Sequence, residues 1–310
     1  MKALRVLILG LFVSISLNAA EGCAVDDFCG KAPCGDCNEY DHYFGRCVRA
    51  LPATPPMMPP FVADPRKVGM SAGWRFDDQV IDNGSSGPVS FGDYAGLLRI
   101  CNPFGRQGAL DIAIEGDVWA IFQQTRESAP LVNADYYVAI PITYGWNCWA
   151  FRLRFFHISS HIGDEFLLDH PDFDRLNPSS EYVDFFVSWR PNCDLRLYGG
   201  IGIIARSDWS YDYRKLYAEY GIEYYLPFGK WWMPKSGVLG RICTGAHFRT
   251  REDNDYKFDG TFVVGYEWSR TYCDYKKVRL YYEYHTGYSL EGQFNRFPTN
   301  YSALVAYYGY

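Results

Sequence analysis

The last nine residues of the chain read Ser302-Ala-Leu-Val-Ala-Tyr-Tyr-Gly-Tyr310. In an extended strand they place Leu304, Ala306, Tyr308 and Tyr310 on one face, because successive side chains of a strand point to opposite sides. The chain also stops on an aromatic residue. Closed membrane barrels present an apolar outer face with aromatic girdles, so this segment predicts the final strand of such a barrel.

Four earlier segments, 149–157, 181–190, 258–269 and 278–285, also carry apolar side chains on one face and polar or charged ones on the other. Apolar faces should meet lipid and charged faces the lumen. A secreted β-sandwich would alternate too. The aromatic chain end favours the barrel, since it resembles the terminal strand that the bacterial barrel-assembly machinery reads.

The same alternation predicts an all-β fold, a transmembrane antiparallel β-barrel of about twelve strands over residues 68–310. We expect strands near residues 69, 91, 110, 134, 148, 181, 194, 214, 238, 258, 277 and 299. The longest outer loop should cover 158–180. Mixed charges should face the lumen and form ion pairs, namely Arg152, Arg154, Asp184, Arg196, Glu219, Glu223, Arg241, Asp259, Glu267, Arg279 and Glu283.

Three short regions precede the predicted barrel. Residues 1–20 combine a basic start, an apolar core and Ala19-Ala20, which is typical of a cleaved secretory signal peptide. Residues 21–50 form a cysteine-rich segment that we expect in the periplasm. Residues 51–67 contain Pro-Pro-Met-Met-Pro-Pro, which predicts an extended linker outside the barrel.

All ten cysteines follow the signal peptide, so they should meet an oxidising compartment in which disulfides persist. The predicted topology puts Cys101, Cys148, Cys193 and Cys273 at the periplasmic turns. We therefore expect a structural role in the cell envelope of the Gram-negative-type outer membrane, with disulfide-linked envelope proteins as possible partners. The alternative is that these thiols are unpaired. A net charge of −6 and the lack of a basic tract argue against a nucleic-acid partner.

One polar segment interrupts the pattern at the end of a predicted strand, His157-Ile-Ser-Ser-His161-Ile-Gly-Asp-Glu165. Together with 174–177 and Tyr198-Gly-Gly it resembles a bacterial family of unknown function numbered 1207. That resemblance covers most of 68–310 and implies an outer-membrane barrel without implying a reaction.

The His157-x-Ser159 pair also resembles the catalytic strands of outer-membrane phospholipase A and of the lipid A deacylase barrel. Both side chains are on the lipid-facing side of the strand. A serine nucleophile needs an adjacent base, and a third group must orient that base. Glu181 begins the next strand on the same face and is the predicted orienting group, with Asn177, Asp164 and Glu165 as alternatives. The resemblance implies a lipid acyl-ester hydrolase acting on outer-membrane lipid.

Two further interpretations remain open from the sequence. His161, Asp164 and Glu165 could bind a divalent cation such as calcium, because hard cations favour carboxylate ligands. The polar residues could instead only build the start of an outer loop. The candidate functions are thus an envelope barrel, a serine-dependent lipid hydrolase and a narrow channel.

Overall fold

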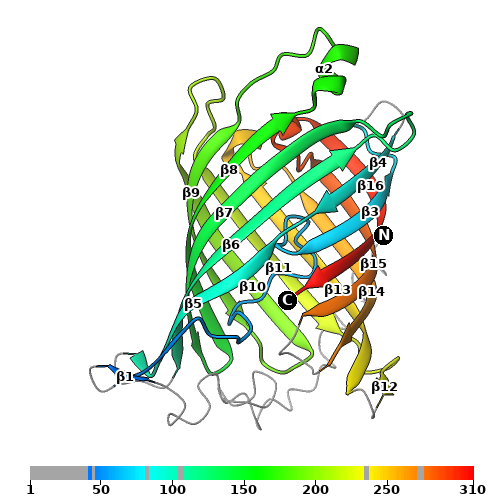
Figure 1. Ribbon diagram of the computed structural model, residues 1–310. Coiled ribbons are helices and arrows are strands. Elements are labelled where there is room, and N and C mark those ends of the chain that lie inside the picture. The colour runs from blue at the N-terminus through cyan, green and yellow to red at the C-terminus, as the bar shows by residue number, and fades with distance from the viewer. Residues whose placement is uncertain (1–40, 44–45, 81–83, 104–107, 234–236, 271–275) are drawn as a thin grey trace, which may run out of the picture.

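The computed structural model describes residues 41–43, 46–80, 84–103, 108–233, 237–270 and 276–310. This part of the chain is almost entirely β-structure wound into one closed barrel (Figure 1). The predicted signal peptide, most of the cysteine-rich segment and Cys273 lie outside the described residues.

Strands that follow one another along the chain are neighbours in the barrel wall. Its strands are β3 (Met70–Phe76), β4 (Ser85–Ser90), β5 (Asp93–Cys101), β6 (Ala109–Phe122), β7 (Leu131–Trp146), β8 (Trp149–Ile162), β9 (Ser179–Trp189), β10 (Leu195–Ser207), β11 (Leu216–Tyr225), β13 (Val238–Arg251), β14 (Gly260–Ser269), β15 (Lys277–Tyr288) and β16 (Pro298–Gly309).

Every pairing between these strands is antiparallel, and β16 closes the wall by pairing with β3. Both β4 and β5 pair with β6, so they form one barrel strand that is interrupted at Phe91 and Gly92. The wall therefore has twelve strands, and the predicted fold class and strand count are confirmed. The closed ring leaves no strand edge exposed to lipid, which is what a membrane barrel requires.

Shorter elements mark the two ends of the barrel. Helix α2 (Asp164–Asp169), η4 (Glu252–Asn254) and η5 (Gly292–Phe294) lie at one end, which we call the α2 end. Strand β12 (Trp231–Met233) pairs with β13 at the opposite end, the β12 end, where β1 (Asp41–Tyr43) and β2 (Arg46–Ala50) also lie (Figure 1). Cys101, Cys148 and Cys193 are at this β12 end.

The longest described connection at the α2 end is 163–178, shorter than the predicted 158–180. The difference arises because β8 and β9 keep pairing as far as Ser159 and Ser179, while Asn133 of β7 pairs with Ile162. The polar segment is therefore strand up to Ile162 and does not begin as a loop.

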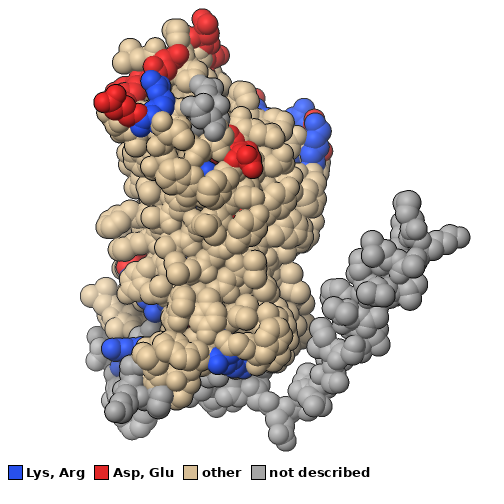
Figure 2. All heavy atoms as spheres, turned by 90° about the vertical axis from the view of Figure 1, so that its right-hand side faces the viewer, with Lys and Arg blue, Asp and Glu red and all other residues tan. Residues whose placement is uncertain are grey.

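Outward side chains of the wall are mainly apolar or aromatic, including Phe155, Phe185, Ile201, Val264, Leu280 and Leu304. On the face drawn in Figure 2, charged side chains gather toward the two ends and are sparse between them. Such an apolar zone is the face that a barrel turns to lipid. In the described residues no helix is long and apolar enough to span a bilayer.

Most of the predicted lumen charges form ion pairs, but Arg152 instead lies over the rings of Phe61 and Phe186 and Glu283 accepts from the Tyr301 hydroxyl. Glu267 is fully buried and lies 3.0 Å from Arg241 and 2.8 Å from Arg279. Arg154 lies 2.6 Å from Asp184. In these pairs each buried charge has a close partner of opposite sign, which offsets the cost of removing it from water.

The proline-rich segment differs from our expectation, because it fills the lumen instead of standing outside. We call residues 56–68 the plug. Phe61 stacks on Tyr198 with ring centroids 3.6 Å apart. Arg196 donates to the carbonyls of Pro59 and Pro60.

Two further features explain why the plug is stable inside the barrel. The Val62 amide donates to Glu223 at 2.6 Å, so a lumen charge satisfies its backbone. A Cβ added at Gly245 would lie 3.1 Å from the Cβ of Ala63, so the wall approaches the plug closely where it has no side chain. A proline-rich chain forms few hydrogen bonds within itself, and here lumen arginines and carboxylates supply them.

Candidate functional site

The apolar outer face ends at one level on two adjacent strands near the α2 end. On β8 the outward residues run Trp149, Phe151, Leu153 and Phe155 before His157. On β9 they run Trp189, Val187, Phe185 and Val183 before Glu181. His157 and Glu181 are direct partners in the register, so the change from apolar to ionisable side chains forms a row across the wall.

His157 and Glu181 also contact each other through their side chains. The Nδ1 atom of His157 lies 3.5 Å from Oε1 of Glu181, and the two side chains are 37% and 47% exposed. A carboxylate next to Nδ1 favours the histidine tautomer that carries its proton on Nδ1, because that proton can then be donated to the carboxylate. Nε2 is left without a proton and can act as a base. The predicted orienting role of Glu181 thus has a geometric basis.

Ser159 follows His157 on the same outward face, two residues closer to the α2 end. Residues two apart on one face of a strand are separated by roughly 6.6 Å along it, which a histidine ring can bridge. In the register Ser159 is opposite Tyr136 on β7 and Ser179 on β9. The three predicted residues Ser159, His157 and Glu181 are therefore neighbours on the surface that faces away from the lumen.

The adjacent serine is unsuited to the same role. Ser160 is only 2% exposed and points inward, where its hydroxyl donates to the side-chain oxygen of Asn133 at 2.9 Å. The parity of β8 thus selects Ser159 as the serine that membrane lipid could reach.

The alternative orienting groups are placed differently from Glu181. Asp164 and Glu165 form the first turn of α2, and Asn177 lies in the 163–178 connection, where its backbone amide bonds Ser210. Across the described residues, no group of three or more His, Cys, Asp or Glu side chains could hold a metal ion. His161 instead packs edge-on against Tyr136, with ring centroids 5.4 Å apart.

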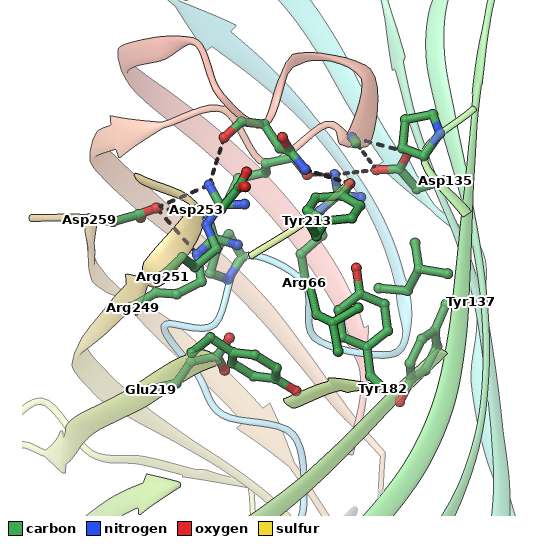
Figure 3. A pocket seen from close by; sticks show the side chains of 18 of the residues that line it. Arg66, Asp135, Tyr137, Tyr182, Tyr213, Glu219, Arg249, Arg251, Asp253 and Asp259 are labelled. Atoms are coloured by element: carbon green, nitrogen blue, oxygen red, sulfur yellow. Dashed lines mark hydrogen bonds and ion pairs between the residues drawn. The ribbon is translucent and has the colours of Figure 1, made fainter. Parts of the chain in front are cut away.

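A second candidate site, which sequence reasoning missed, is a cavity of about 150 Å³ inside the lumen toward the α2 end. Figure 3 shows Arg249, Arg251 and Asp259 on one side of it and Asp135 and Tyr137 on the other. The charges are paired, because Arg249 lies 2.8 Å from Asp259 and Arg66 2.5 Å from Asp135. The cavity is therefore polar but nearly balanced in charge.

The connection 289–297 covers this cavity at the α2 end. Gly292 donates its amide to Asp135, and Gln293 bonds the carbonyl of Ser160, so the segment crosses the lumen to β7 and β8. Glu291 lies 2.9 Å from Arg75. Burial alone would raise the pKa of Glu291, but Arg75, Arg66 and the Ser289 hydroxyl outweigh it and lower the pKa to about 2.

The plug closes the same cavity from below, where Asp64, Pro65 and Arg66 line it. The apolar residues Met57, Met58, Phe61 and Val62 within the proline-rich stretch were the signal that could have predicted a buried segment. Their pairing with the wall depends on contacts more than a hundred residues away in sequence.

Residues 48–310 match the model of a protein family described as "Protein of unknown function (DUF1207)". The chain belongs to this family. The match covers the whole barrel, so the resemblance drawn from the polar segment is confirmed. No curated protein sequence matches the chain.

Among solved structures the DUF1207 chain resembles outer-membrane phospholipases. One is the Salmonella typhi outer membrane phospholipase, described as a dimer with bound calcium, with a TM-score of 0.53, 12% identity, and coverage of 79% of this chain and 93% of that one. Another is outer membrane phospholipase A from Escherichia coli, with a TM-score of 0.53, 11% identity and the same coverage. At this identity the likeness establishes an outer-membrane type of barrel fold.

Proposed function

We propose that this chain is an outer-membrane lipid acyl-ester hydrolase in which Ser159 is the nucleophile, His157 the base and Glu181 the orienting group. The observation that carries the proposal is the contact between His157 and Glu181 on the outward face, with Ser159 beside them. A protein that needs only a stable wall gains little from a carboxylate–histidine pair at a lipid boundary. A serine hydrolase can use such a pair, in which the carboxylate orients the histidine that acts as the base of the nucleophile.

The proposed site would lie in the outer leaflet. The longest described connection, 163–178, is at the α2 end and the shortest turn, 147–148, is at the β12 end. Outer-membrane barrels have their long loops outside and short turns in the periplasm. The apolar row that ends at His157 and Glu181 would reach the headgroup boundary there. Lipid ester bonds lie at that depth, next to Ser159.

The reaction would follow ordinary acyl transfer. His157 Nε2 accepts the proton of Ser159 as Oγ attacks the ester carbonyl, and the imidazolium then returns the proton to the departing glycerol or sugar oxygen. The acyl group remains on Ser159 as an ester. Water, deprotonated by His157, attacks this ester and releases the fatty acid with a free serine.

The test uses purified barrel refolded in detergent and incubated with phospholipid or lipid A, with and without calcium, while released fatty acid is measured. We expect release by the wild type and a loss of at least about a hundredfold in Ser159→Ala and His157→Ala. Ser179→Ala is the matched control, because Ser179 is the cross-strand partner of Ser159. Equal release by wild type and Ser159→Ala would overturn the proposal.

Two further variants separate the role of Glu181 from general folding. We expect Glu181→Gln to keep part of the activity, because an amide oxygen can still accept from Nδ1, and Glu181→Ala to lose more. The calcium arm tests whether a cation contributes to the reaction. If activity is unchanged when calcium is removed by a chelator, calcium does not take part in the reaction.

An envelope role supported by periplasmic disulfides stays a second proposal. Cys47 and Cys101 are both disulfide-bonded, and both lie at the β12 end, which the proposed topology puts in the periplasm. If cross-linked partners exist, gels without reductant should contain adducts that reductant removes. The plug and the buried ion pairs occupy the lumen, which argues against a channel role.

A further inference from the structure

The row of His157 and Glu181 continues onto a third strand. In the register between β9 and β10, Glu181 is opposite Arg206. The outward residues of β10 before this point include Leu197, Ile201 and Ile203, so Arg206 is also the first charged residue beyond the apolar zone. His157, Glu181 and Arg206 therefore form one line across three adjacent strands.

Arg206 reaches this line only because β10 contains an irregularity. Ile204 is buried and pairs with Tyr182, and strict alternation would turn residue 206 to the same inward side. The register shifts between Ile204 and Arg206, which inserts one unpaired residue and places Arg206 opposite the outward Glu181. Bulges of this kind redirect a side chain and are frequent beside functional sites.

The surroundings leave the Arg206 guanidinium available. Arg206 is exposed, and the described carboxylate on which its charge acts is that of Asp208, two residues further along the chain. Glu181 is occupied by His157 at 3.5 Å. Asp208, the other nearby carboxylate, accepts from the hydroxyl of Ser210 at 2.6 Å and from its amide at 2.9 Å.

The position matches what a phospholipid would present at this depth. Adjacent strands are about 4.8 Å apart, so Arg206 is roughly 10 Å from His157 across the wall. A glycerophospholipid holds its ester carbonyls and its phosphate on one glycerol unit, and a guanidinium binds phosphate through paired hydrogen bonds. Trp209, three residues further on, is 92% exposed, as is typical of a side chain in the headgroup region.

We propose that Arg206 binds the phosphate of a membrane lipid and so positions the ester of that lipid at Ser159. This inference rests on the proposed hydrolase function and adds its substrate class, a phosphate-bearing lipid. Arg206 is a positioning residue, since it would act on substrate affinity and not on the reacting atoms.

The first experiment compares Arg206→Gln with wild type on three substrates, a glycerophospholipid, lipid A and a diacylglycerol without phosphate. We expect KM to rise about ten- to a hundredfold for one or both phosphate lipids, from the usual strength of a charged hydrogen bond, with kcat little changed. KM for diacylglycerol should stay the same. Arg206→Lys should recover part of the affinity, and Arg270→Gln removes an equal charge at the β12 end as a control.

The second experiment does not depend on hydrolysis. It measures equilibrium binding of a short-chain dialkyl ether phosphatidylglycerol, which has no cleavable ester, to the Ser159→Ala barrel with and without Arg206→Gln. Weaker binding with Arg206→Gln supports the phosphate site even if the chain proves not to be a hydrolase.

Equal binding by both barrels would overturn the inference while leaving the hydrolase proposal standing. An equal rise in KM for diacylglycerol would also overturn it, since the effect would then be unrelated to phosphate. Inorganic phosphate that binds as tightly as the ether lipid would reassign the site to free anions.

Discussion

Replacing Glu291 by glutamine should destabilise the barrel and remove one part of its acid sensitivity. The carboxylate lies 2.9 Å from Arg75, with side chains 7% and 8% exposed. It also accepts from the Ser289 hydroxyl at 2.6 Å. These contacts hold the connection 289–297 over the lumen cavity, so the change acts on that cover and leaves the lipid-facing row untouched.

The magnitude follows from the pKa of Glu291, which is lowered from an ordinary 4.5 to about 2. At about 1.36 kcal/mol for each pKa unit, that difference of about 2.5 corresponds to a contribution on the order of 3 kcal/mol to the free energy of unfolding. Since the folded pKa is depressed, the stabilisation is fully present above about 4.5 and disappears as the pH falls toward 2. Arg75 keeps Asp78 at 3.3 Å, which limits the loss in the variant.

The assay is urea unfolding in detergent micelles, followed by tryptophan fluorescence between pH 7 and pH 2.5. Glu291→Gln should be less stable than wild type at pH 7, and the gap should close as the pH falls below 4.5. Glu165→Gln, an exposed change on α2, is the control and should match wild type. A gap that is absent at pH 7, or that stays constant down to pH 2.5, would refute the reasoning.

Two other changes test the lumen. Glu267→Ala should lower the free energy of unfolding by about 3 to 5 kcal/mol, because it leaves two buried arginines without their carboxylate; urea unfolding measures this, and a loss below 1 kcal/mol would contradict it. Gly245→Leu should push the plug away from the wall at Ala63 and so raise the conductance measured in planar bilayers. Gly199→Ala is the control, because an added Cβ there meets only ordinary contacts, and its conductance should equal that of wild type.

The amino-acid sequence by itself determined the wall of this protein. A strand repeats every two residues, so the apolar and polar faces can be assigned from neighbouring residues alone. That local rule gave the twelve strands, the inward position of the lumen charges and the outward position of His157, Ser159 and Glu181. All of these agree with the structure, because lipid on one side and a narrow lumen on the other leave little freedom in the register.

Only the tertiary structure decided what fills and borders that wall. The plug enters the lumen because Glu223 and Arg196 bond a segment more than a hundred residues away, and no local periodicity encodes such a pairing. The cover at 289–297 depends on Asp135 in the same way. The outward position of Arg206 contradicts simple alternation, since a one-residue shift in register reverses a side chain and depends on how two neighbouring strands pair.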